Sequence, residues 1–104
     1  MAAIRYPEGD VTRAAQDALA RQAERMAQAA REYAPVDTGA LRSSISSCME
    51  GGEAVISASV PYAAAVELGS FARAPRPFLS PAYQALKQET IEAVARAMQE
   101  ELSL

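Results

Sequence analysis

The sequence predicts an α+β domain with two long helices and an antiparallel β-hairpin between them. Apolar residues recur at steps of three and four through residues 10–33 and again through residues 80–101, as on one face of a helix. Around Gly51-Gly52 apolar residues alternate with polar ones instead, as they do in half-buried strands. A chain of 104 residues supports one hydrophobic core, so we expect a single domain over residues 1–104.

Composition and charge exclude several classes of function. The formal net charge of −3 and a pI near 4.9 disfavour binding to nucleic acid or to an anionic membrane surface. No apolar stretch approaches the ~20 residues of a membrane span, and no secretion signal is recognisable. The chain has no histidine and only Cys48, which excludes histidine-based metal sites, catalytic triads and internal disulfides. We therefore expect no enzymatic activity and no cofactor.

The first helix is expected to begin at Asp10, a good N-cap residue, and to end near Tyr33 because Pro35 cannot continue it. Residues 1–9 are expected to form a loose N-terminal lead-in. The apolar stripe of this helix consists of Val11, Ala15, Leu19, Ala23, Met26, Ala30 and Tyr33. Alanine dominates the hydrophobic half of the composition, so a core built from it is thin and favours association with other copies or partners.

A turn at Asp37-Thr38-Gly39 leads into the expected hairpin. The first strand is predicted to start near Leu41 and to place on one face Leu41, Ser43, Ile45, Ser47 and Met49. A two-residue turn at Gly51-Gly52 would pair Met49 with Ala54, Ser47 with Ile56, and Ile45 with Ala58, which gathers the apolar side chains on one side. The same register sets Glu50 opposite Glu53, an unfavourable pairing that a longer loop would avoid.

The second half of the chain is expected to consist of a short helix, an extended loop and the last helix. Pro61 opens the short helix, which runs through Leu68 and ends at Gly69. Residues 70–77 have neither a helical nor a strand period and form an extended loop rich in proline and arginine. Ser80-Pro81 then starts the long C-terminal helix, which continues to about residue 101 and packs on the sheet.

Three local features invite a catalytic interpretation, and a structural one is stronger for each. Asp37-Thr38-Gly39 occurs in retroviral aspartic proteases, but there it follows an apolar strand, whereas here it follows a helix and a proline. Cys48 has no histidine to activate it. Glu67 lies among apolar neighbours and therefore needs a partner, for which Arg42 and Arg76 are the candidates.

Three segments, in order, resemble one protein family. Residues 34–45 resemble its signature A-P-x-D-T-G-x-L-R-x-S-I, and residues 62–70 resemble Y-A-x-x-V-E-x-G-T with Ser70 in place of the threonine. Residues 76–82 resemble R-P-F-L-x-P-A, the entry to the last helix. The family is the gene-product-ten-like tail components of HK-type long-tailed phages, which include tail-completion (head–tail joining) proteins.

The resemblance implies a structural virion protein of the phage neck that joins the head connector to the tail. It implies self-association into a ring, often a hexamer, contacts with connector and tail proteins, and localisation in the virion after assembly in the host cytoplasm. The positions that carry the motifs are Pro35, Asp37, Thr38, Gly39, Leu41, Arg42, Ser44, Ile45, Tyr62, Ala63, Val66, Glu67, Gly69, Pro77, Phe78, Leu79 and Pro81. By the resemblance, Phe78 and Leu79 anchor the loop to the core; a pairing of Glu67 with Arg42 is our own inference.

Partner contact is also a hypothesis for the proline-rich loop, where the candidates are Phe71, Arg73 and Arg76. A solvated loop is the open alternative. For the whole protein, the alternatives are a tail terminator or minor tail component in the same virion, and a small dimeric adaptor or regulatory protein. Bound partners discriminate them, because a joining protein must touch the head connector.

Overall fold

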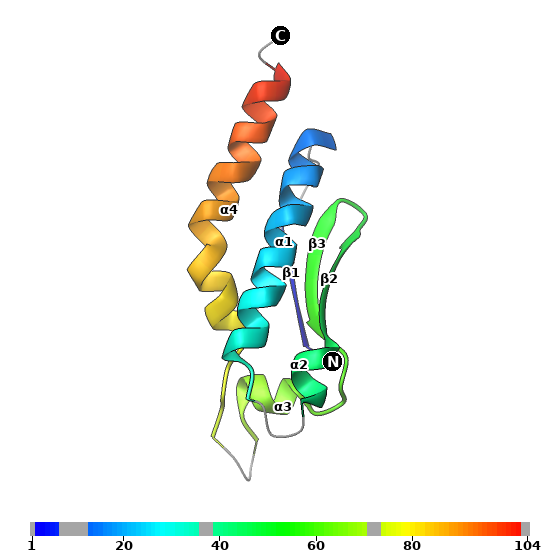
Figure 1. Ribbon diagram of the computed structural model, residues 1–104, viewed down its shortest axis with the longest axis vertical. Helices are drawn as coiled ribbons and strands as arrows, with labels where there is room; N and C mark the ends of the chain where they lie inside the picture. Colours follow the sequence, from blue (N-terminus) through cyan, green and yellow to red (C-terminus); the bar gives the residue numbers. More distant parts are fainter. Residues whose placement is uncertain (1, 7–12, 36–38, 71–73, 103–104) are drawn as a thin grey trace.

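The computed structural model describes residues 2–6, 13–35, 39–70 and 74–102 of the chain. In chain order, its elements are β1 (Ala2–Tyr6), α1 (Arg13–Tyr33), α2 (Ala40–Ser44), β2 (Ile45–Glu50), β3 (Glu53–Ala58), α3 (Ala63–Leu68) and α4 (Leu79–Leu102). Helices α1 and α4 lie side by side along the long axis, and the sheet packs on the other side of α1 (Figure 1). The predicted α+β class is confirmed.

Helix α1 holds the core together because it contacts both the sheet and α4. Its buried face is made mostly of alanine and consists of Ala15, Ala18, Leu19, Ala23, Met26, Ala27 and Ala30. Small side chains let the neighbouring backbones approach closely, so the packing compensates for the small area that each alanine buries. The expected N-cap Asp10 and the first stripe residue Val11 lie outside the described residues.

Helix α4 packs along α1 and reaches the sheet at β1. Thr90 and Val94 are buried where the two helices meet, as the apolar stripe predicts. Two polar contacts link the helices: Arg25 pairs with Glu89, and the Thr90 hydroxyl lies 3.4 Å from Gln22 Oε1. The helix begins at Leu79, one residue before the expected Ser80-Pro81 start. None of the described helices is long and apolar enough to cross a membrane.

The sheet has three antiparallel strands in the order β1-β3-β2, so the expectation of a loose lead-in at residues 1–9 is wrong for residues 2–6. Strand β1 pairs along its whole length with β3, from Ala2 opposite Ala58 to Tyr6 opposite Ala54. The strand is stabilised by this distant partner. A five-residue segment rich in alanine carries little strand signal of its own.

The hairpin of β2 and β3 has the predicted register, with Met49 opposite Ala54, Ser47 opposite Ile56, and Ile45 opposite Ala58. The predicted two-residue turn is confirmed, and the alternative of a longer loop is wrong. Gly51 and Gly52 alone form the turn, with φ of +56° and +86°, values that suit the two-residue hairpin turns favoured by strand twist. Glu50 and Glu53 therefore do face each other across the strand ends.

The first strand is shorter than predicted, because Leu41 and Ser43 belong to the one-turn helix α2. Alternating residues over so short a segment fit a strand face as well as a helical turn, which explains the error. Gly39 precedes α2 with φ of +79°, and Leu41 reaches the core from the helix. Helix α3 follows a turn at Pro61-Tyr62, and Gly69 ends it with φ of +83°, as predicted.

Candidate interaction site at one end of the molecule

Glu67 joins α3 to the beginning of α4. Its side chain is buried, and its Oε1 atom accepts hydrogen bonds from the backbone N–H groups of Phe78 and Leu79 at 3.0 and 2.7 Å. The other oxygen, Oε2, accepts a bond from the N–H of Ser80 at 3.2 Å. The first N–H groups of a helix have no partner within the helix, and a carboxylate there also favours the helix dipole. Glu67 thus caps α4 from a different helix.

A second contact closes the same loop at its base. The backbone N–H of Arg76 donates to the carbonyl oxygen of Val66 at 2.8 Å. Together with the Glu67 bonds, it fixes both ends of residues 69–77, which we call the arm. Within the arm, the described residues Ala74 to Pro77 are exposed and have no helical or strand structure. Ser70 likewise has no helical or strand structure, and residues 71–73 of the expected loop lie outside the described residues.

The hydrogen bonds at Glu67 determine its ionisation. Burial would raise the pKa of this carboxyl group, because the interior disfavours charge. The donors at Leu79, Phe78 and Ser80 stabilise the carboxylate by more than this, so its pKa lies below the usual value of 4.5. The group is therefore a carboxylate at neutral pH, as a cap of three N–H donors requires.

Phe78 and Leu79 anchor the chain directly after the arm. Phe78 is 0% exposed and Leu79 is 3% exposed, and both belong to the main hydrophobic cluster. Ala63 of α3 lies in the same cluster and is also fully buried. Buried apolar residues of α3 and of the α4 start therefore flank the contact of Glu67 and hold the N–H groups in place.

The proposed pairing of Glu67 with Arg42 or Arg76 is wrong. Both carboxylate oxygens are used by backbone N–H groups. The Nε atom of Arg42 is buried without a hydrogen-bond partner, and Arg76 is exposed. The error has a physical cause: only charged side chains were considered as partners of Glu67, whereas the N–H groups at the start of a helix also lack partners within the helix. A buried glutamate followed some ten residues later by an expected helix start was the signal that could have identified this cap.

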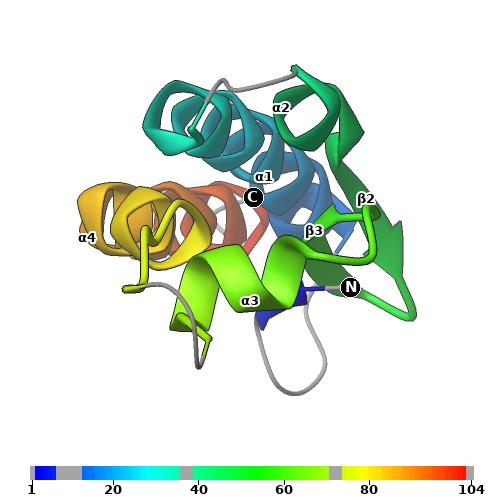
Figure 2. The ribbon, with the colours of Figure 1, turned by 90° about the horizontal axis from the view of Figure 1, so that it is seen from below.

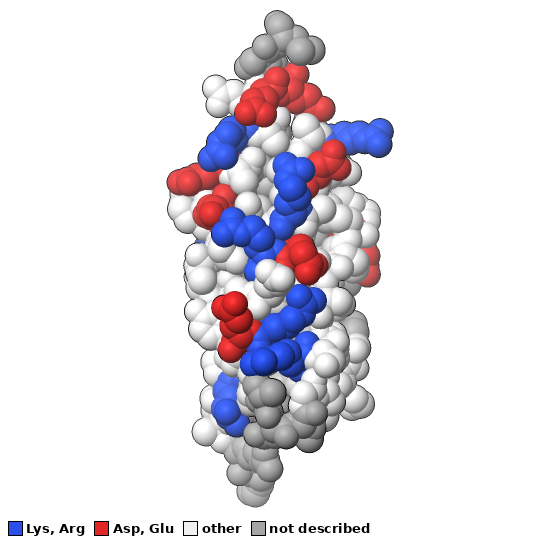
Figure 3. All heavy atoms as spheres, viewed as in Figure 1, with Lys and Arg blue, Asp and Glu red and all other residues white. Residues whose placement is uncertain are grey.

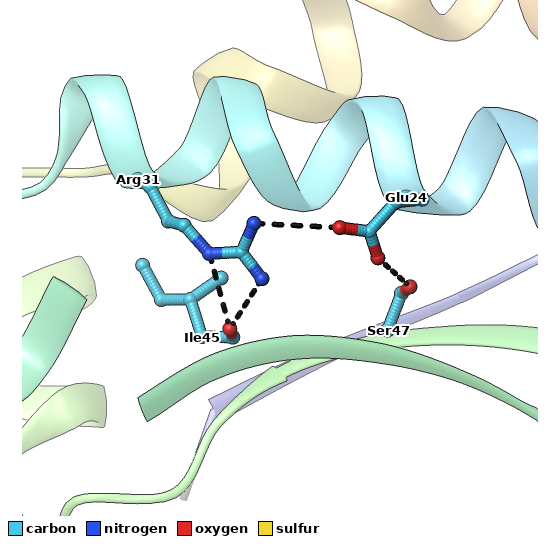
Figure 4. A network of polar contacts seen from close by, with 4 residues as sticks. All are labelled: Glu24, Arg31, Ile45 and Ser47. Atoms are coloured by element: carbon cyan, nitrogen blue, oxygen red, sulfur yellow. Dashed lines mark hydrogen bonds and ion pairs between the residues drawn. The ribbon is translucent and has the colours of Figure 1, made fainter. Parts of the chain in front are cut away.

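The first motif segment is held to α1 by a polar network that sequence reasoning missed (Figure 4). Arg31 donates to the carbonyl oxygen of Ile45 through Nε at 3.3 Å and through Nη2 at 2.8 Å. Its Nη1 lies 3.4 Å from Glu24, whose other oxygen accepts the Ser47 hydroxyl at 2.8 Å. Nothing distinguished Arg31 from the other charged residues on the helix surface except its seven-residue spacing from Glu24.

The remaining residues of the first motif serve the turn into β2. Leu41 and Ile45 are 4% and 2% exposed, so both pack in the core, Ile45 from β2 and Leu41 from α2 rather than from the strand where it was expected. The hydroxyl of Ser44 donates to the Leu41 carbonyl at 2.8 Å and so closes the last turn of α2. Asp37 and Thr38 lie outside the described residues, as do Phe71 and Arg73 of the proposed partner contact.

The three motif segments, far apart in sequence, meet at one end of the molecule (Figure 2). A pocket of about 240 Å³ lies there, lined by Pro35, Tyr62, Ala65, Val66, Ser70, Ala74 and Arg76. Most of its lining residues are apolar, and Tyr62, Ser70 and Arg76 are the lining residues with polar side-chain groups. Such a pocket suits an apolar side chain that is accompanied by a carboxylate. This arrangement is suited to contact with another protein.

The cysteine and the acidic side chains of the described residues can be placed individually. No cluster of His, Cys, Asp and Glu side chains among the described residues could hold a metal ion. Cys48 is exposed on β2, with its Sγ atom 3.7 Å from Glu50 Oε1. The one buried carboxylate among the described residues, Glu67, is occupied by the start of α4.

Comparison with known proteins identifies the family. The family model described as "Bacteriophage HK97-gp10, putative tail-component" matches residues 5–69, more than half of the chain. No curated protein and no solved structure matches the chain. The match spans the first motif segment and all of the second except Ser70, and Glu67 joins the third segment to the second. The chain therefore belongs to the HK97-gp10-like family of bacteriophage proteins.

Proposed function

We propose that the protein is a structural component of the phage neck that joins the head connector to the tail, and that it acts there as a ring. Family membership indicates a phage tail component and hence a place in the virion. The observation that supports the joining role most directly is the end of the fold where the three motifs meet. There, buried residues fix the exposed residues 74–77 beside a mostly apolar pocket. Its partners would be connector and tail proteins.

This role requires no enzymatic activity. Among the described motif residues, Gly39 shapes a turn, Leu41, Ile45 and Phe78 fill the core and Glu67 caps a helix, which are tasks of a scaffold. Substitutions in them are therefore expected to change folding or particle assembly rather than a reaction rate. The acidic chain also suits a ring through which DNA passes, because a lumen with few cations does not retain phosphates.

Electron microscopy of a lysate from phage lacking this gene tests the proposal. DNA-filled heads beside separate tails of normal length are expected, because each half assembles without the joining protein. Tails of abnormal length would instead indicate a tail terminator. Intact, infectious virions would overturn the neck role altogether. Expression of the wild-type protein from a plasmid should restore complete particles, which excludes effects on neighbouring genes.

Binding measurements separate the joining role from its alternatives. A joining protein must bind purified head connector as well as tail tube, whereas a terminator or minor tail component needs only tail proteins. A stable dimer with affinity for neither would indicate the adaptor role. The Lys87→Glu variant is a suitable control, because Lys87 is exposed on α4 and does not line the pocket.

A further inference from the structure

The two ends of the molecule differ in chemistry. The protein measures 56 Å along its long axis and 23 × 21 Å across it. Helix α3 and the pocket lie at one end, and the last turns of α4 lie at the other (Figure 1). The two ends of one chain are therefore too far apart to meet, and a contact between them must join two copies.

The α3 end is apolar and carries a cation. Tyr62, Ala65 and Leu68 follow one another at every third position and are all exposed, with 78% exposure for Leu68. Large exposed apolar side chains in a contiguous patch are typical of contact surfaces. Arg76 is the charged residue of the adjoining pocket, and the described residues supply no carboxylate to its guanidinium.

The α4 end carries two exposed carboxylates in its last turn, and Glu100 lines a pocket there with Arg21 and Arg96 of the same chain. Acidic side chains gather at this end of the helix (Figure 3), where Glu100 and Glu101 are exposed and the last turn has no basic residue. The C-terminus of a helix carries partial negative charge and favours cations, so two carboxylates there raise the electrostatic energy of the isolated chain. A guanidinium from another molecule would lower it.

We propose that the last turns of α4 of one copy dock against the α3 end of the next, with Arg76 pairing with Glu100 or Glu101. The contact uses different surfaces on the two copies, so it propagates head to tail and closes into a ring where the rotation between copies permits. It specifies the interface of the proposed ring and rests on that proposal. One such contact is small and weak alone, whereas in a closed ring every copy makes two.

Charge reversal at both ends tests the contact with purified protein in sedimentation experiments over a concentration series. Arg76→Glu, and separately the pair Glu100→Arg with Glu101→Arg, should each weaken self-association by about tenfold or more. A mixture of the two variant proteins should associate again, because each supplies the complement of the other. The matched control Lys87→Glu, also exposed, should behave as the wild type. Unchanged association of the reversed variants, or a wild-type chain that stays monomeric up to its solubility limit, overturns the proposal.

Cross-linking supplies a second test that is independent of charge. In a Cys48→Ser background, Arg76→Cys with Glu101→Cys should give a ladder of dimers, trimers and higher species under an added oxidant. A side-by-side dimer would give no product beyond the dimer, and that result overturns the head-to-tail contact. Moving the second cysteine to the exposed mid-helix position, as Glu92→Cys, should abolish the ladder.

Complementation separates this inference from the proposed function. If the knockout yields separate heads and tails but the Arg76→Glu protein restores full infectivity, the neck role stands and the head-to-tail contact is wrong. If the knockout phage is intact while the charge-reversal and ladder experiments succeed, the contact stands and the neck role fails.

Discussion

Glu67 connects parts of the chain that the sequence separates by about ten residues, and it does so through backbone N–H groups at the start of α4. Its carboxylate satisfies three N–H groups of the α4 start, and the arm that leaves α3 returns beside it. Leaving such donors buried and unpaired is costly. The residue therefore controls the stability of the whole end of the molecule where the motif segments meet.

Glu67→Gln should lower the free energy of unfolding by about 1–3 kcal/mol at neutral pH. The amide carries no charge, and its NH2 group replaces one accepting oxygen, so that a donor faces a backbone N–H donor. Urea unfolding measures the difference. The wild-type pKa is lowered in the folded state, so the carboxylate stabilises the fold above the ordinary value of 4.5 and this contribution is lost as the pH falls below it. The gap between wild type and variant should narrow there; a gap independent of pH would contradict the charged cap.

Phe78→Ala should lower the free energy of unfolding by roughly 3–5 kcal/mol, because the ring is fully buried and its removal leaves a cavity. Thermal unfolding followed by circular dichroism checks this. Leu68→Ala is the matched control: that side chain is 78% exposed, so its loss should change stability by no more than about 0.5 kcal/mol. Equal stability of the Phe78 variant and the wild type would remove Phe78 from its anchoring role.

Gly39→Val should destabilise the protein by roughly 1–2 kcal/mol or more, because φ of +79° is left-handed and a β-branched residue resists it. Space is not the cause, since a Cβ atom at this position would meet nothing within 4 Å. Gly39→Asn should therefore cost clearly less, as asparagine tolerates this conformation. Chemical unfolding measures the free energy of unfolding of both variants. Equal decreases in the two variants would indicate a steric clash rather than backbone strain.

At the level of elements, long periodic segments were predictable and short ones were not. Two long helices and the hairpin register follow from patterns that repeat several times. Helix α2 is a single turn, over which alternation and helical spacing cannot be told apart. Strand β1 depends on hydrogen bonds to β3, a partner some fifty residues later that its own composition does not indicate. The pocket likewise depends on tertiary contacts between the three motif segments.

The buried alanines of α1 indicate that the elements around this helix pack closely. Ala27→Leu should destabilise the fold by about 1–3 kcal/mol, because Ala27 is 0% exposed and extra methyl groups have no room. The neighbouring exposed residue provides the control, and Gln28→Leu should have little effect. Urea unfolding of both variants measures this. A stabilising effect of the leucine at position 27 would reveal an underpacked core.

For the whole molecule, β1 makes the N-terminal segment part of the sheet rather than an appendage. Because the strand order is β1-β3-β2, deleting residues 1–6 would turn the central strand β3 into an edge strand with unpaired backbone groups. The truncated protein should unfold at a lower temperature and aggregate on storage, as calorimetry and light scattering would show. Unchanged behaviour would mean that the β1 pairing contributes nothing to stability.

The closed base of the arm has a consequence for how such a protein can diversify. Glu67 and the Arg76–Val66 bond hold α3 and the start of α4 together, so a longer connection between them leaves these closing contacts in place. The entropic cost of a longer loop grows only with the logarithm of its length. Related phages could thus exchange this segment like an interchangeable part, retaining one scaffold while matching different neighbours in the particle.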